Sequence, residues 1–127
     1  MDIIIKEILN KNLGDVFEFH PDFFYEFEEL VAKSGQEEKI SKLFLQKLLA
    51  IMSLNNIDCG PKWIEHLKYV DNMYSLHIDT NNKNFRVLFS KKSKKKYFLH
   101  MFHERSGKKT TDYDKHISIA IERRDNK

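Results

Sequence analysis

The stretch from Tyr74 to His103, YSLHIDTNNKNFRVLFSKKSKKKYFLHMFH, decides the fold. It contains three strand-like runs, Tyr74–Asp79, Asn84–Ser90 and Lys96–His103, which two short polar segments separate. Apolar and polar side chains alternate in the first two runs, as is typical of half-buried strands. Because short connections join antiparallel neighbours, we expect a three-stranded antiparallel meander.

Helical periodicity flanks this predicted sheet on both sides. Apolar residues recur every three to four positions in three segments, which predicts helices over residues 22–35, 37–54 and 112–124. We expect Asp22 to cap the first of these helices and Gly35 to end it.

Three shorter segments complete the predicted fold. Residues 1–14 are expected to form a short N-terminal helix, Val16–Phe19 a short strand, and Trp63–Leu67 one or two helical turns. The result is an α+β fold: a small antiparallel sheet with two packed N-terminal helices and a C-terminal helix. All 127 residues are expected to form one domain.

The composition fits a single globular domain. Hydrophobic residues make up 41% and charged residues 32%, with only 4 Gly and 2 Pro, which excludes disordered and collagen-like chains. Apolar runs such as Ile3–Ile5 are too short to span a membrane, so no membrane partner is expected. The single Cys59 excludes an internal disulfide, so we expect a cytoplasmic protein.

Charge is distributed unevenly along the chain. Residues 1–60 contain 6 basic and 11 acidic residues, whereas residues 61–127 contain 16 basic and 8 acidic. The densest basic part is 83–109, where Glu104 is the one acid. Such a local field attracts phosphate backbones, so nucleic acid is the expected partner. The alternative is that these lysines are solvated turns that protect sheet edges.

Several short motifs follow one another between Val16 and Arg124. They are FHP (19–21), GPKWIEHL (60–67), YSLHI (74–78), FRVLF (85–89), LHMF (99–102), KKT (108–110) and ISIA (117–120). This succession resembles the RelE-type toxin superfamily, most closely its HigB-like, or phage Gp49-like, branch. The resemblance implies a toxin of a type II toxin–antitoxin pair, an endoribonuclease that cleaves mRNA on the ribosome. It also implies a cognate antitoxin, expected to be of the helix-turn-helix type.

The chain departs from the family pattern at several places. His77 stands where the family commonly has an arginine, and Glu104-Arg105 replaces an early lysine pair. Lys108-Lys109 comes three or four residues later, and no proline precedes the last helix. Which cation fills which role is therefore left open.

RNA cleavage without a metal or other cofactor needs a base for the 2′-hydroxyl, an acid for the leaving oxygen and cations for the phosphorane. Arg86 is expected to hold the phosphate and His77 to act as base or acid, with Arg105 and Lys109 adding positive charge. The alternatives are an Arg86 that pairs with an acid and a His77 that only faces solvent. Since His100 and His103 are expected on opposite strand faces, no metal site is predicted.

Eight further residues are expected to contact RNA. The lysine run is expected to dock on folded RNA, while Tyr113 is expected either to stack on a base or to belong to the core. The acidic residues Glu26, Glu28 and Glu29 are expected to lie away from the RNA. The eight residues are Lys91, Lys92, Lys94, Lys95, Lys96, His103, Lys108 and Tyr113.

The alternative function is a noncatalytic, phage-derived RNA- or DNA-binding module.

Overall fold

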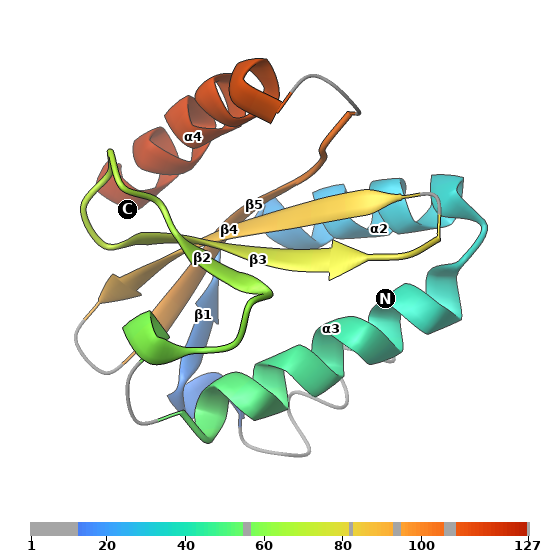
Figure 1. Cartoon of the computed structure of the whole chain (residues 1–127), viewed down its shortest axis with the longest axis horizontal. Coiled ribbons are helices and arrows are strands. Elements are labelled where there is room, and N and C mark those ends of the chain that lie inside the picture. Colours follow the sequence, from blue (N-terminus) through green and yellow to red (C-terminus); the bar gives the residue numbers. More distant parts are fainter. Residues whose placement is uncertain (1–12, 55–56, 82, 93–94, 106–108, 127) are drawn as a thin grey trace.

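The computed structural model describes residues 13–54, 57–81, 83–92, 95–105 and 109–126 (Figure 1). The expected N-terminal helix falls almost entirely on residues 1–12, outside these ranges. The elements, in chain order, are η1 (Leu13–Asp15), β1 (Phe17–Phe19), α2 (Phe23–Ser34), α3 (Glu37–Met52), η2 (Ile57–Cys59), β2 (Ile64–His66), β3 (Met73–Asp79), β4 (Asn84–Lys92), β5 (Lys95–His103) and α4 (Lys109–Asp125).

The strands form one five-stranded sheet in the order β1-β5-β4-β3-β2. The predicted meander is confirmed, because β3, β4 and β5 pair antiparallel. The expectation of a purely antiparallel sheet was wrong, since β1 pairs parallel to β5. The reason is the connection: α2, α3 and three further strands separate β1 from β5, which is long enough for a parallel neighbour.

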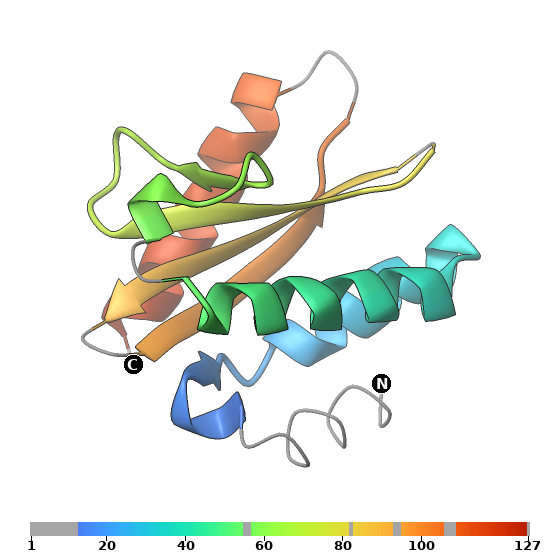
Figure 2. The same ribbon diagram turned by 60° about the horizontal axis from the view of Figure 1, so that its bottom comes forward.

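Helices cover both faces of the sheet (Figures 1 and 2). α2 and α3 pack on one face around Phe98. The centroid of its ring lies within 6.1 Å of the ring centroids of Phe17, Phe19, Phe23, Phe44 and Phe89. α4 packs on the other face, where Tyr113 and Ala120 join Leu88, Leu99 and Phe102 in a second core. The α+β fold with three helices is confirmed.

The predicted helical turns at Trp63–Leu67 were wrong. Ile64–His66 is instead a strand that pairs antiparallel with β3. Ile64 packs against the core under α2 and α3, whereas Leu67 belongs to the core under α4. Residues three apart lie on one side of a helix but on opposite faces of a strand, so only the strand places both side chains.

A β-bulge lies in the middle of β5. Leu88 of β4 pairs with His100 but Phe89 pairs with Phe98, so Leu99 has no partner of its own across the strand. Phe98 and Met101 therefore face α2 and α3, while Leu99 and Phe102 face α4. Strict alternation would group Leu99 with Met101 and Phe98 with Phe102, but the bulge breaks the alternation.

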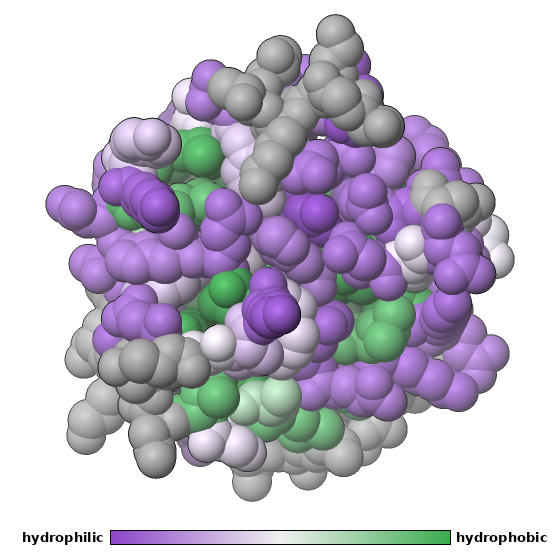
Figure 3. Space-filling model, in the orientation of Figure 1, coloured by the Kyte–Doolittle hydropathy of each residue, from purple (hydrophilic) through white to green (hydrophobic). Residues whose placement is uncertain are grey.

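The described residues include no helix that is long and apolar enough to cross a membrane. The face of the molecule shown in Figure 3 is largely hydrophilic, with apolar atoms confined to separate small areas.

Candidate functional site

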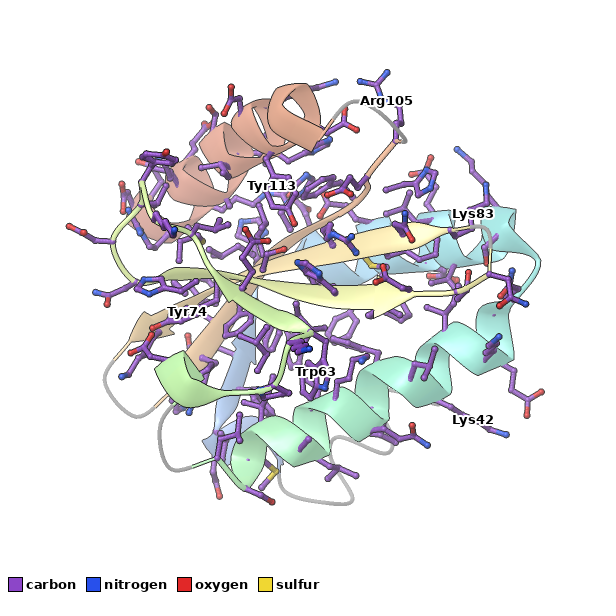
Figure 4. All side chains as sticks on the ribbon, viewed as in Figure 1. Lys42, Trp63, Tyr74, Lys83, Arg105 and Tyr113 are labelled. Atoms are coloured by element: carbon purple, nitrogen blue, oxygen red, sulfur yellow. The ribbon has the colours of Figure 1, made fainter. Side chains whose placement is uncertain are left out.

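His77 and Arg86 are directly opposite each other on β3 and β4. Their shared sheet face is the one that α4 covers, so the first turns of α4 bring Tyr113 next to them (Figure 4). Alternation along the two strand-like runs predicts that these two side chains share a face, which the pairing confirms, and α4 covers that face. Arg86 is only 6% exposed.

A chain of polar contacts connects four side chains at this place. His77 Nε2 lies 3.2 Å from Glu65 Oε1 and 3.5 Å from the Tyr113 hydroxyl. The Tyr113 hydroxyl also lies 2.9 Å from the Ser75 hydroxyl. Because the same nitrogen faces a carboxylate and a phenol, a protonated Nε2 donates to Glu65 and an unprotonated one accepts from Tyr113.

Burial sets the protonation of this cluster. Burial and the nearby Arg86 charge lower the pKa of His77, although Glu65 opposes them. Burial raises the pKa of Tyr113 to about 12. At neutral pH the cluster therefore holds a neutral imidazole, which can accept a proton, beside a protonated phenol, which can donate one.

Two carboxylates hold the Arg86 guanidinium. Its Nη1 lies 2.6 Å from Asp79 Oδ1, and its Nε and Nη2 lie 3.3 and 3.4 Å from the two oxygens of Glu104. Nη1 also donates to the Phe85 carbonyl oxygen at 3.0 Å. Arg86 thus makes ion pairs with acids, which is one of its two expected roles, and both carboxylates compete with a phosphate for the guanidinium.

Arg105 binds Asp112, in the first turns of α4. The Arg105 backbone N donates to Asp112 Oδ2 at 2.8 Å and its Nη2 to Oδ1 at 2.5 Å. The hydrogen bonds from Arg105 lower the pKa of Asp112 to about 2. This pairing connects the end of β5 to α4. The Arg105 side chain is 60% exposed, and Figure 4 shows it apart from Tyr113.

The lysines at the end of β4 and the start of β5, called the lysine hairpin below, lie at the end of β4 remote from Arg86. Lys91 is opposite Lys96, and Lys95 lies 3.8 Å from Glu18. Lys91 is five positions after Arg86 in β4, which is roughly 17 Å along a strand, so the structure does not bring these lysines to the cluster. Lys94 and Lys108 fall outside the described residues, as do the side chains of Lys92 and Lys109.

His103 faces away from the cluster. Its ring packs on Phe85, and burial together with the Lys83 charge lowers its pKa. Glu26, which was expected with Glu28 and Glu29 to lie away from the RNA, binds Arg123 and His100, each at 2.8 Å. α2 turns this carboxylate toward the edge of β5 that β1 leaves unpaired.

Sequence reasoning missed Glu65 and Ser75. Glu65 pairs with Ser75 across β2 and β3, next to His77. An alternation of Ile64, Glu65 and His66 was the signal available, but the apolar residues around it favoured helical turns. Sequence and structure comparisons found no matching family model, curated protein or solved structure. In the part of the chain that the structure describes, no group of His, Cys, Asp and Glu is arranged to hold a metal ion.

Proposed function

We propose that this protein is an endoribonuclease that cleaves mRNA by attack of the 2′-hydroxyl on the adjacent phosphate. The observation that carries the proposal is the Glu65–His77–Tyr113 chain beside Arg86. A neutral imidazole, a phenol of high pKa and a guanidinium on one sheet face supply the base, the acid and the positive charge that the reaction needs.

Each residue has a role that follows from its contacts. His77 accepts the proton of the 2′-hydroxyl, and Glu65 stabilises the imidazolium that forms. Tyr113 donates a hydrogen bond to the phosphorane or a proton to the leaving 5′-oxygen. Arg86 binds the phosphate after the more exposed Asp79 is displaced, while Glu104 keeps the guanidinium in place.

The biological setting follows from the resemblance described above and is part of the same proposal. The protein acts in the cytoplasm on mRNA at the ribosome, and a helix-turn-helix antitoxin holds it inactive. The two helices before the meander and the helix after it support the likeness to RelE-type toxins. The lysine hairpin and Arg105, which lie at different places on the molecule, contribute nonspecific contacts to RNA.

The test is cleavage of one defined mRNA in a cell-free translation reaction, with new 5′ ends mapped. His77→Ala is expected to reduce the cleavage rate by about 10²- to 10⁴-fold, the usual contribution of a general base. His66→Ala is the matched control, because His66 is a half-exposed histidine on the neighbouring strand whose ring contacts Asp58 and Tyr74. Equal rates for both variants would refute the assignment of His77.

Two further lanes separate parts of the proposal. A lane with naked mRNA tests whether cleavage depends on the ribosome. Cuts in that lane would show that the ribosome is not required. Metal independence is tested with a chelator on naked mRNA alone, because ribosomes need Mg²⁺, and cleavage of naked mRNA that the chelator abolishes would contradict the proposed chemistry.

The second candidate is a noncatalytic RNA- or DNA-binding module. The two carboxylates on Arg86 favour it, since a guanidinium already bound to two anions is a poor phosphate ligand. This candidate predicts intact mRNA in every lane, together with binding that weakens as salt rises.

A further inference from the structure

A small hollow lies at the end of the sheet where β4 begins and β5 ends. It has a volume of about 160 Å³ and lies between this sheet end and the last turns of α2. Leu30 and Phe85 form its apolar walls, and its polar residues are Lys33, Ser34, Lys83 and His103. It lies away from the polar chain of His77 and Tyr113.

The ionisable residues that line this hollow are all bases. Lys33 forms an ion pair with Glu29 at 2.9 Å on the exposed side of α2. By contrast, no hydrogen bond or ion pair connects the Lys83 ammonium to another side chain within the described ranges. Its charge acts on His103, whose pKa it helps to lower. Asp112 and Glu104 act on the pKa of His103 in the opposite direction, but no carboxylate is among the lining residues, so a cation beside this hollow favours an anion.

The hollow lies at the same sheet end as the candidate site. Phe85 immediately precedes Arg86 in β4, and Glu104, which binds Arg86, immediately follows His103. The two sites face opposite sides of the sheet at its end, so a flexible strand that passes around this end reaches both. A single-stranded polyanion has that flexibility.

We infer that Lys83, with Lys33 and His103, forms a binding site for a backbone phosphate of the RNA substrate. The inference rests on the proposed function for the identity of the polyanion, and it adds a contact that positions the RNA without taking part in the chemistry.

The experiment measures binding of a fluorescent single-stranded RNA whose 2′-hydroxyls are all methylated, so that it cannot be cleaved by 2′-hydroxyl attack. Affinity is measured by anisotropy from 0.05 to 1 M salt for the wild type, Lys83→Gln and Lys83→Arg. Lys42→Gln is the matched control, because Lys42 is an exposed lysine on α3, far from the hollow (Figure 4).

Lys83→Gln is expected to reduce the slope of log affinity against log salt by about 0.7, the value for one phosphate contact on a single strand. That change corresponds to about fivefold weaker binding at 0.1 M salt and almost none at 1 M. Lys83→Arg should restore the slope, and Lys42→Gln should leave it unchanged. Equal slopes for Lys83→Gln and Lys42→Gln, or no binding by the wild type, would overturn the inference.

A second arm uses inorganic phosphate, followed by the His103 ring signals in an NMR titration. One outcome is that Lys83→Gln abolishes the phosphate-induced shifts and leaves RNA binding unchanged. That result would assign the hollow to a free anion and overturn the RNA assignment. Since cleavage is not measured, the result is independent of the catalytic proposal. Wild-type protein that binds the methylated RNA with the expected slope but never cleaves mRNA would refute the catalytic proposal alone.

Discussion

A buried arginine shows how the candidate site balances stability and function. The Arg86 side chain is 8% exposed, and taking a guanidinium out of water is costly unless anions surround it. Asp79 and Glu104 provide those anions. Asp79 is 54% exposed and Glu104 only 14%, so the Asp79 contact is the one that solvent already competes for. The Asp79 contact is therefore the weaker of the two anchors of the guanidinium.

The histidine pair on β5 and α4 makes stability depend on pH. His116 Nδ1 lies 2.6 Å from His100 Nε2, and the His116 ring stacks on Phe102 at 4.2 Å. Burial, and after it the neighbouring His100, lowers the pKa of His116 to about 4, while Asp112 and Glu26 act in the opposite direction.

Because the folded state resists protonation of His116, the unfolded state binds a proton first as pH falls below about 6.5. The free energy of unfolding should therefore fall as pH drops from about 6.5 to about 4. For this half-exposed ring we expect a loss of about 1–2 kcal/mol, after allowing for screening by solvent. Urea unfolding at pH 7, 5.5 and 4.5 measures it.

The comparison for this prediction is His116→Phe, which keeps the stacking on Phe102 and cannot take up a proton. Its stability should fall less over the same pH range. Some dependence will remain, because burial also lowers the pKa of His77 and His103. A variant as pH-sensitive as the wild type would contradict the role of His116.

At the scale of elements, the end of α2 depends on one glycine. Gly35 has φ of 72°, in the left-handed region, and a Cβ added there would meet no heavy atom within 4 Å. The cost of Gly35→Ala is therefore backbone strain alone, about 1 kcal/mol lost from the free energy of unfolding. Urea denaturation measures this loss.

Gly14→Ala is the control for Gly35→Ala. An added Cβ at Gly14 also meets nothing within 4 Å, and Gly14 is not among the glycines with positive φ. We expect a change of less than about 0.5 kcal/mol. If the two variants were equally stable, the left-handed backbone of Gly35 would not be what ends α2.

The elements that the sequence predicted well are those that local pattern decides. The alternation in β3 and β4 placed His77 and Arg86 on one face of the sheet, and Gly35 marked the end of α2. Local pattern could not show the bulge at Leu99, which only the pairing with β4 defines.

Long-range contacts account for the rest of what the sequence did not predict. Asp22 is the N-cap residue of α2, as expected, but its side chain makes no capping hydrogen bond, and its backbone N donates to His20 Nδ1 in a local contact. The carboxylates on Arg86 are 7 and 18 residues away in sequence, and Glu65 reaches His77 only because β2 pairs with β3. Such contacts follow from the assembled sheet.

At the scale of the whole molecule, one ion-pair network connects the two helical layers. β1 pairs only with Lys96–Phe98, so the second half of β5 is an open sheet edge. Glu26 of α2 reaches past this edge to Arg123 of α4, and both Glu26 oxygens lie 2.8 Å from that guanidinium. Arg123 also donates to the Leu99 carbonyl oxygen at 2.8 Å, so α2, β5 and α4 meet at one point.

Glu26→Ala should therefore destabilise the protein by about 2–3 kcal/mol, because it leaves a half-buried arginine without its anion. Glu29→Ala is the matched control: Glu29 lies on the same helix in an exposed pair with Lys33, and its loss should cost less than about 0.5 kcal/mol. Urea unfolding gives both values, and amide hydrogen exchange should rise in α4 for Glu26→Ala alone. Similar stability for the two variants, or faster exchange confined to α2, would mean that apolar packing of α4 on the sheet holds the layers together without this ion pair.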